Sequence, residues 1–338
     1  MYAKIDTEMA QFYQDKVVLV TGGTGSIGRK IVRELVNYSP KKIIVFSKDD
    51  SKQYLMKQAF KQFHHIYYLI GDIRDYQRIE YVTRGVDYIF HTAALKQVPT
   101  CEENPDEAIK TNVLGSINVI EAAIKNNVKK VINISTDKAV NPVNTMGATK
   151  LLTEKLFKQA NMKLNNNQTK FCSVRFGNVI GSRGSVIPLL YEQLITGKAL
   201  TITDMNMTRF FMSVEEAVQL TVKAGYYTEG GETYILKMKA LKLEDLVKAL
   251  MEFAKKHQLK KPKVQVIGAR PGEKIYEELA FEFELAQIYE TEDMYVISNN
   301  ELPKNKFRKT SLMNYRSDQV NPIQQHEMLM IIEELNQS

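Results

Sequence analysis

The chain has 338 residues, of which 44% are hydrophobic and 25% charged, a composition that excludes disorder along its whole length. Its formal charge of +7 suggests anionic partners, for which phosphorylated small molecules fit at least as well as nucleic acid. The two cysteines need no disulfide framework, no stretch approaches the ~20 apolar residues of a membrane span, and the N-terminus has no signal-peptide core. We therefore expect a cytoplasmic protein without a membrane segment.

Strand and helix patterns alternate through the first half of the chain. Strands are predicted within residues 16–20, 41–47, 66–72, 86–94, 129–136 and 170–179, and helices within 29–38, 51–63, 106–127 and after Thr145. Such alternation of continuous apolar strands with helices predicts an α/β fold with a Rossmann-type, doubly wound parallel sheet. On such sheets ligands lie beyond the carboxyl ends of the strands, so the residues that follow each strand are the candidates for a site.

The regular alternation of strand and helix patterns ends after residue 178, where loops, short strand pieces and amphipathic helices follow one another. We predict a first domain over residues 1–178 and a smaller C-terminal α/β lobe over 179–338. Segments of this second part can still return to the first domain. No element is predicted within the last ~45 residues, because their pattern is polar and weakly periodic.

A glycine-rich turn joins the first strand to the first helix. Gly22, Gly25 and Gly28 form a Gly-x-x-Gly-x-x-Gly pattern, with Thr24, Ser26 and Ile27 between them. Glycine allows the backbone to approach a pyrophosphate, and the helix N-terminus supplies N–H donors and a positive dipole. In this position between strand and helix, the pattern predicts a binding site for a diphosphate-linked dinucleotide.

The second strand ends in the sequence "VFSKDD", which bears on the choice of dinucleotide. An acid directly after this strand would bind a free ribose 2′-hydroxyl, whereas Ser47 and Lys48 suit a 2′-phosphate. These residues favour NADP over NAD, and the nearby Asp49 leaves NAD open. Asp72 and Ile73, after the third strand, are expected to flank the adenine.

Further motifs show a family resemblance. With the glycine turn, the sequences "HTAALKQVP", "ISTDKAVNP", "MGATK", "VRFGNVIGSRGSVIP", "TITDMNMTRFFMSVEEAV" and "GARPGEKIYEEL" resemble the extended short-chain dehydrogenases/reductases. More narrowly, they resemble the nucleotide-sugar 4,6-dehydratases that act on UDP-N-acetylglucosamine. The resemblance covers about residues 16 to 280 and implies an NAD(P)-dependent hydro-lyase that gives a UDP-4-keto-6-deoxy-N-acetylhexosamine.

One position departs from the usual pattern of this superfamily. The Tyr-x-x-x-Lys pair is here Met146-x-x-x-Lys150, as in some UDP-N-acetylglucosamine 4,6-dehydratases. Met146 has no proton to exchange, and as a flexible thioether it also suits a simple packing role. Lys150 is expected to hold the nicotinamide ribose.

The resemblance implies roles for the residues after the fifth strand. A 4,6-dehydratase oxidises C4 of the sugar, removes the C5 proton, expels the 6-hydroxyl and returns the hydride to C6. By resemblance, Asp137 is the acid at O6 and Lys138 the base at C5, while Thr136 bonds the 4-hydroxyl. Burial favours the neutral form of both Asp137 and Lys138, but their mutual attraction favours the charged forms, and the sequence leaves this balance open.

The same resemblance assigns the remaining ligand-binding residues. For the cofactor these are Ala93, Ala94, Lys96, Asn112 and Ser135, besides the residues named above. For the substrate, a UDP-sugar, these are Lys96, Asn178, Arg183, Ser185, Val186, Pro188, Thr201, Arg209, Arg270 and Glu273. No histidine or cysteine has acidic partners at ligand spacing, so no metal site is predicted.

Several alternatives remain at this point. "MGATK" and "RPGEK" resemble the dehydratases that retain the C5 configuration, which we favour slightly, whereas "FSKDD" resembles the inverting group. A UDP-N-acetylglucosamine 4-epimerase shares the fold and cofactor but needs no acid–base pair at C5 and C6. A non-catalytic dinucleotide sensor would tolerate loss of Lys138. The resemblance also implies a homo-oligomer, and no motif indicates nucleic-acid binding.

Overall fold

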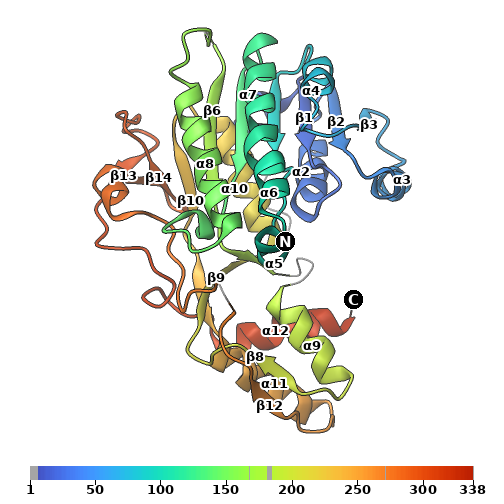
Figure 1. Cartoon of the computed structure of the whole chain (residues 1–338), viewed down its shortest axis with the longest axis vertical. Helices are drawn as coiled ribbons and strands as arrows, with labels where there is room; N and C mark the ends of the chain where they lie inside the picture. The colour runs from blue at the N-terminus through green and yellow to red at the C-terminus, as the bar shows by residue number, and fades with distance from the viewer. Residues whose placement is uncertain (1–6, 167, 181–184, 271, 338) are drawn as a thin grey trace.

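The structure is a computed structural model that describes residues 7–166, 168–180, 185–270 and 272–337. Its centre is a sheet with a core of parallel strands, seen in the upper part of Figure 1. Strand β1 lies between β2 and β4. The parallel strands follow the spatial order β3 (Ile66–Ile70), β2 (Lys42–Ser47), β1 (Val17–Thr21), β4 (Tyr88–His91), β5 (Lys130–Ile134), β6 (Lys170–Arg175) and β10 (Thr233–Leu236). The predicted α/β fold with a doubly wound parallel sheet is confirmed.

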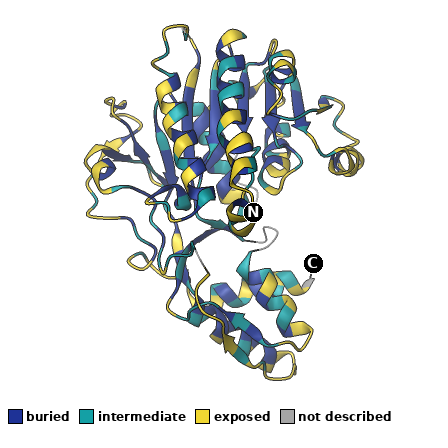
Figure 2. Ribbon diagram, in the orientation of Figure 1, coloured by how far each residue is buried: buried dark blue, intermediate teal, exposed yellow. Residues whose placement is uncertain are grey.

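Helices cover both faces of the sheet, because successive residues of each strand point to opposite faces and both sets are apolar. In β1, Val18 and Val20 join one hydrophobic core while Leu19 joins another. The first core is covered by α1 (Thr7–Tyr13), α2 (Ser26–Val36), α3 (Asp50–Ala59) and α10 (Val214–Tyr227), and the second by α4 (Tyr76–Val82), α7 (Gly115–Lys125) and α8 (Thr145–Ala160). Figure 2 shows the resulting pattern of buried strands and outward-facing exposed helix surfaces.

Short helical segments lie where strands β4 and β5 end. After β4 the chain forms α5 (Val98–Glu103), α6 (Pro105–Ala108) and the π-helical turn η1 (Ile109–Leu114), which runs into α7. After β5 it forms the 3₁₀ turn η2 (Asp137–Ala139). These segments occupy the carboxyl edge of the sheet, where ligands of this fold bind.

A smaller lobe lies beyond this edge, at the bottom of Figure 1. Its hydrophobic core is formed by α9 (Val186–Ile195), α11 (Leu243–Lys256), α12 (Gln325–Gln337) and the parallel strands β8 (Leu200–Ile202) and β12 (Val264–Val266). A second small sheet in the order β11 (Lys239–Lys242), β9 (Thr208–Met212) and β7 (Asn178–Val179) connects the lobe to the main domain.

Parts of the second half of the chain belong to the main sheet. Strand β10 extends it in parallel next to β6, and the antiparallel strands β14 (Met294–Ile297), β13 (Ile288–Glu290) and β15 (Arg308–Lys309) follow. The turn η3 (Glu282–Gln287) leads into β13. The lobe is therefore interleaved along the chain with strands of the first domain, and the division of roles at residue 178 stays a prediction.

A buried arginine fastens one of these returning segments to α8. Arg175, at the end of β6, donates from Nε and Nη2 to the Glu154 carboxylate at 2.9 and 2.6 Å. It also donates from Nη1 and Nη2 to Glu284 of η3 at 2.6 and 3.1 Å. Burial alone would lower the pKa of Arg175, but the two carboxylates hold it well above its usual range. Planar, two-sided hydrogen bonding of this kind suits guanidinium and not an ammonium group.

Replacement of Arg175 should destabilise the protein strongly. Arg175→Leu would leave Glu154 and Glu284 buried without their cation, which costs about 3–5 kcal/mol of unfolding free energy in comparable buried pairs. Urea unfolding followed by circular dichroism measures the loss. The matched control is Arg84→Leu, which removes a solvent-exposed pair with Glu80 and should cost less than about 1 kcal/mol. Equal losses in the two variants would contradict the structural role of Arg175.

Candidate active site

The glycine turn is packed so closely that two of its glycines cannot carry a side chain. Gly22 has a φ of +64°, and a Cβ placed there would lie 2.7 Å from the backbone of Ala93. A Cβ on Gly28 would lie 2.6 Å from the carbonyl oxygen of Gly22. Helix α2 starts at Ser26, and its N-cap residue Gly25 has no side chain to cap the first N–H groups. The turn therefore presents a tight backbone cradle and helix N–H donors, the arrangement that binds a pyrophosphate.

The end of β2 meets this turn through hydroxyl groups. Thr24 Oγ1 and Ser47 Oγ lie 2.9 Å apart and share a hydrogen bond. Asp49 caps α3 by accepting a hydrogen bond from the backbone N–H of Lys52 at 2.9 Å, and it is paired with the Lys52 ammonium group. The Asp49 carboxylate is thus already bonded to α3, which makes it a poorer candidate for binding a ribose hydroxyl.

Asp72 and Ile73, predicted to flank the adenine, have different surroundings. Asp72 accepts hydrogen bonds from Arg74 Nε at 3.0 Å and Nη2 at 2.7 Å, and Lys48 Nζ lies 3.8 Å from it. Partial burial would raise the pKa of Asp72, but the hydrogen bonds from Arg74 lower it overall. Ile73 is buried against Gly115, where a Cβ would lie 2.7 Å from the Ile73 side chain. Lys48 is mostly exposed at the mouth of this region.

The loop after β4 is held by a buried amide. Asn112 accepts from the Leu95 N–H at 2.8 Å, and donates to the Leu95 carbonyl and to Thr149 Oγ1, both at 3.0 Å. Its amide is thereby used for shaping the loop that carries Ala94 and Lys96. Asn112 lies in the π-helical turn η1, a type of distortion frequent at functional sites. Lys96 itself is exposed.

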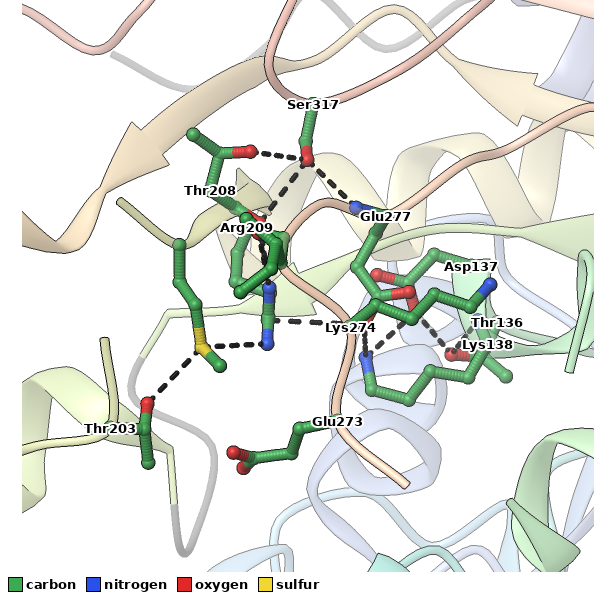
Figure 3. Close-up of polar contacts among 12 residues, drawn as sticks. Thr136, Asp137, Lys138, Thr203, Thr208, Arg209, Glu273, Lys274, Glu277 and Ser317 are labelled. Carbon is green, nitrogen blue, oxygen red and sulfur yellow. Dashed lines mark hydrogen bonds and ion pairs between the residues drawn. The ribbon is translucent and has the colours of Figure 1, made fainter. Parts of the chain in front are cut away.

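The residues after β5 form a connected polar group (Figure 3). Thr136 Oγ1 donates to Asp137 Oδ1 at 2.8 Å, and Lys138 Nζ donates to the same oxygen at 3.0 Å. Asp137 is fully buried, while the Lys138 side chain is 21% exposed. Asp137 Oδ2 and the neighbouring Ser135 Oγ are buried, and neither has a hydrogen-bond partner among the described residues. Such unpaired buried atoms are costly, and they indicate places where a ligand completes the bonding.

A residue that the sequence analysis did not single out completes this group. Glu277, from the segment after Gly272, places Oε1 3.6 Å from Lys138 Nζ and 3.8 Å from Arg209 Nε. Its Oε2 is buried and has no hydrogen-bond partner among the described residues. Glu277 lies in the motif "GARPGEKIYEEL", but its neighbour Glu278 is equally acidic, and only the inward direction of one side chain distinguishes them.

The charged side chains of this group change one another's pKa values. Burial alone would lower the pKa of Lys138, but Asp137 and Glu277 raise it overall. Burial raises the pKa of Glu277, and Asp137 adds to the effect, against the lowering by Lys138 and Arg209. For Lys138 the attraction therefore outweighs burial, and the ammonium form is favoured. A base at this position must first lose a proton.

Lys150 is also a buried cation, and it makes no hydrogen bond or ion pair with the residues that the structure describes. Burial lowers its pKa to about 8, while Glu154 acts in the opposite direction. His91 shares hydrogen bonds with the Thr21 hydroxyl through Nδ1 at 2.8 Å and with the Ser116 hydroxyl through Nε2 at 3.0 Å. Burial, together with the charge of Lys150, lowers the pKa of His91 to about 3. His91 is therefore a neutral core histidine.

Met146 packs as a hydrophobic residue. Its side chain is 5% exposed and forms a small cluster with Cys101 and Ala108. The partly buried Leu95 and Val98 complete the cluster. The face of α8 where a tyrosine hydroxyl would stand is thus apolar.

The predicted substrate residues of the lobe are spread over several elements. The side-chain amide of Gln193 donates to the Thr201 hydroxyl at 2.8 Å, and the Thr201 N–H donates to the Gln193 side-chain oxygen at 2.9 Å. The Thr201 hydroxyl is therefore already hydrogen-bonded within the lobe. Ser185 precedes α9, and its buried Oγ has no hydrogen-bond partner among the described residues. Val186 and Pro188 lie in the first turn of α9 and Asn178 begins β7, while Arg183 lies outside the described residues.

The residues predicted to bind the diphosphate and ribose differ in whether they contact the group around Lys138. Arg209 donates to the Thr208 carbonyl at 2.8 Å and faces Glu277, so it belongs to the group around Lys138 (Figure 3). Arg270 is exposed, and its N–H donates to Glu273 at 3.1 Å. The structure thus brings Arg209 to the acid–base group but leaves Arg270 and Glu273 on a loop at its rim.

Comparison with known proteins places this geometry in a family. The family described as polysaccharide biosynthesis protein matches residues 18–299. The chain belongs to this family. Membership confirms the resemblance to the extended short-chain dehydrogenases/reductases and to the UDP-N-acetylglucosamine 4,6-dehydratases among them.

Curated relatives align along most of their length. An uncharacterized membrane protein of Methanocaldococcus jannaschii is 45% identical over 97% of this chain and 98% of its own. The inverting UDP-N-acetylglucosamine 4,6-dehydratase of Campylobacter jejuni is 43% identical over 85% and 84%. A UDP-glucose 4-epimerase of Rickettsia akari is 46% identical over 81% and 80%. Among solved structures, Pen from Bacillus thuringiensis has a TM-score of 0.89 at 44% identity, covering 97% of this chain and 99% of that one.

Among the described residues, no helix is sufficiently long and apolar to cross a membrane. The same part of the chain holds no group of three or more His, Cys, Asp or Glu residues arranged as metal ligands.

Replacement of Lys150 should stabilise the protein. With a pKa of about 8 in the folded chain against 10.5 for the free side chain, the buried ammonium costs about 3 kcal/mol at pH 7. Lys150→Met should therefore raise the unfolding free energy at pH 7 by up to this amount. Because the unfolded chain holds this proton more tightly, wild-type stability rises with pH above 8, and the gap should narrow by about 2 kcal/mol at pH 9.5.

Urea unfolding of the cofactor-free proteins at the two pH values measures this difference. Lys158→Met, which replaces an exposed lysine of the same helix that bonds Asn299, is the matched control and should show a smaller gap. If Lys150→Met were less stable than the wild type at pH 7, the burial of an uncompensated ammonium group would be refuted.

Proposed function

We propose that the protein is a UDP-N-acetylglucosamine 4,6-dehydratase that works with a bound NAD(P) cofactor. The observation that carries the proposal is the buried Thr136–Asp137–Lys138 group at the carboxyl end of β5. Removal of a C5 proton and expulsion of the 6-hydroxyl need an acid and a base side by side, and this group supplies both. The name of the Campylobacter jejuni relative supports the same reaction and substrate.

The chain's own residues fit a dinucleotide. The cradle of Gly22 and Gly28 and the N-terminus of α2 would hold the pyrophosphate. The unpaired Ser135 hydroxyl and the Lys150 ammonium group would receive the nicotinamide half. When bound, the cofactor would accept a hydride from C4 of the sugar and return one to C6.

The proton movements can be assigned to side chains so that they balance. Asp137, relayed by Thr136, takes the proton of the 4-hydroxyl and later delivers it to the departing 6-hydroxyl, which leaves as water. Lys138 in its neutral form takes the C5 proton, and a proton is returned to C5. This assignment needs no acid at Met146, which explains how a thioether is tolerated there.

We propose that the UDP moiety extends from this group towards the lobe. Arg209 lies beside Lys138 with its guanidinium partly satisfied, and Asn178 begins the neighbouring strand β7. Ser185, Val186 and Pro188 at the start of α9 would line the uridine side. Arg183 between these residues lies outside the described residues. Arg270 and Glu273 at the rim would contact the diphosphate and a ribose hydroxyl.

For C5 we propose inversion. The motifs "MGATK" and "RPGEK" favoured retention slightly, whereas the two Campylobacter jejuni relatives, at 43% and 44% identity, carry the name inverting. The two outcomes differ in whether a proton reaches the face of C5 from which Lys138 removed one, which gives retention, or the opposite face, which gives inversion. Self-association, implied by the family resemblance, is proposed without a subunit number.

The reaction gives a direct test. Incubation with UDP-N-acetylglucosamine in deuterated water should give a product lighter by one water and carrying deuterium at C5, with the proton couplings of the inverted sugar in NMR spectra. Asp137→Asn and Lys138→Ala should each lower turnover by at least ~100-fold, because each removes a proton-transfer group. Glu278→Gln, one residue from Glu277 but outside the acid–base group, should keep wild-type turnover.

The names of the Rickettsia relatives make 4-epimerisation the second candidate. An epimerase would give a product of unchanged mass from the same sugar or from UDP-glucose, with hydrogen at C5 retained. A product without loss of water would therefore refute the dehydratase and support this alternative.

We further propose that NADP binds more tightly than NAD. The exposed Lys48 and the Ser47 hydroxyl lie at the end of β2, where the adenosine ribose would bind, and the Asp49 carboxylate is occupied by α3 and Lys52. Lys48→Ala should weaken NADP by about five- to tenfold and leave NAD within twofold, since an ammonium–phosphate contact at a surface contributes about 1 kcal/mol. Isothermal titration calorimetry with both dinucleotides measures this, and Lys57→Ala, which replaces an exposed lysine of α3, is the control. Tighter binding of NAD to the wild type would refute the preference.

A further inference from the structure

Lys138 contacts two carboxylates that come from distant parts of the chain. Asp137 is its neighbour in sequence, whereas Glu277 arrives on the segment that leads back from the lobe to the main sheet (Figure 3). The Glu277 side chain is 4% exposed, and its Oε2 lacks a hydrogen-bond partner among the described residues. A carboxylate with one oxygen near an ammonium group and the other unpaired has room for a proton.

The proposed reaction leaves one proton unassigned. Asp137 and Glu277 raise the pKa of Lys138, which favours its ammonium form. Lys138 must be neutral before it can take the C5 proton. Asp137 cannot accept the surplus proton as well, since it is already assigned the proton of the 4-hydroxyl. A third group must hold it while the sugar is in place.

We propose that Glu277 is a positioning residue that takes up this proton from Lys138 and holds it during the C5 chemistry. The inference rests on the proposed function. In the step, one N–H bond of the Lys138 ammonium breaks and an O–H bond forms on Glu277, giving a neutral amine and a neutral carboxylic acid. No oxidant or other reactant is needed, and the proton returns to Lys138 when product leaves.

The charges around Glu277 are compatible with this exchange. The groups that face it are Lys138, Asp137, Arg209 and, farther off, Lys274, which donates to the Val140 carbonyl at 2.7 Å. Burial and Asp137 raise the pKa of Glu277 despite the three cations. Transfer leaves the net charge of the group unchanged. It turns an ion pair into a neutral pair, which becomes easier when a bound sugar excludes water, because burial disfavours charged forms.

Exchange of the C5 hydrogen of the 4-keto product isolates this step. Purified UDP-4-keto-6-deoxy sugar, made by the wild type, is incubated with each variant in deuterated water, and C5 deuteration is followed by NMR. This readout needs no hydride transfer. All proteins compared carry Asp137→Asn, because with a 4-keto sugar no 4-hydroxyl proton occupies Asp137, which could otherwise take the proton of Lys138. Glu277→Gln keeps a hydrogen-bonding group of the same size but cannot take a proton, so its exchange rate at pH 7 should fall by at least ~100-fold below that of the protein that keeps Glu277.

The pH dependence separates proton uptake from a structural role. In the protein that keeps Glu277 the internal transfer should make C5 exchange nearly independent of pH, because Lys138 and Glu277 start as an ion pair. In Glu277→Gln, Lys138 must lose its proton to solvent, and the rate should rise by about tenfold per pH unit. Glu277→Asp should recover much of the rate and the flat profile, and Glu278→Gln should leave both unchanged. The affinity for UDP, measured by calorimetry, should stay within about threefold in all variants.

The possible results lead to distinct conclusions. A Glu277→Gln variant whose exchange is not slowed, or is slow but does not respond to pH, overturns the inference. Loss of UDP affinity in that variant also overturns it, because it indicates a structural role. If the wild type itself releases no water from UDP-N-acetylglucosamine, the proposed function fails, and the inference about Glu277 fails with it.

Discussion

The contact of the Lys138 ammonium group with Asp137 and Glu277 is the interaction on which the candidate site depends. It joins the end of β5 to a segment that lies more than a hundred residues later in the chain. Arg209 of β9 adds a second cation, so two carboxylates and two cations meet with little solvent between them. Charges in such surroundings are stable only as a set, because removal of one leaves its partner buried and unpaired.

A second set of buried charges leaves Lys150 without an ion-pair partner among the described residues. Glu154 lies one helical turn after Lys150, close enough in sequence for an ion pair within α8. Arg175 holds both oxygens of Glu154 instead, together with Glu284. Lys150 is left without a hydrogen bond to any residue that the structure describes, at a cost in stability that sites for binding commonly carry. The ion pairs that fasten the C-terminal segment therefore also leave the ammonium group available for a ligand.

The apolar surroundings of Met146 restrict the routes for protons. Its cluster with Cys101 and Ala108 contains no group that titrates near neutral pH, and burial raises the pKa of Cys101 further. In the proposed reaction, proton transfer would therefore fall to Thr136, Asp137, Lys138 and Glu277. These neighbouring groups would carry out the proton transfer in which a tyrosine at position 146 would otherwise take part.

The sequence determined the parallel sheet, the glycine turn and the adjacency of Asp137 and Lys138, because these depend on local periodicity, on the absence of a side chain and on neighbouring positions. It did not single out Glu277, since nothing local distinguishes it from Glu278. It also predicted a cofactor role for Asn112 and a substrate role for Thr201, whose side chains prove to be bonded to Leu95 and Gln193. Only the tertiary structure decided the charge of Lys138. Burial and attraction oppose each other there, and their balance depends on a carboxylate that folding brings from the far end of the chain.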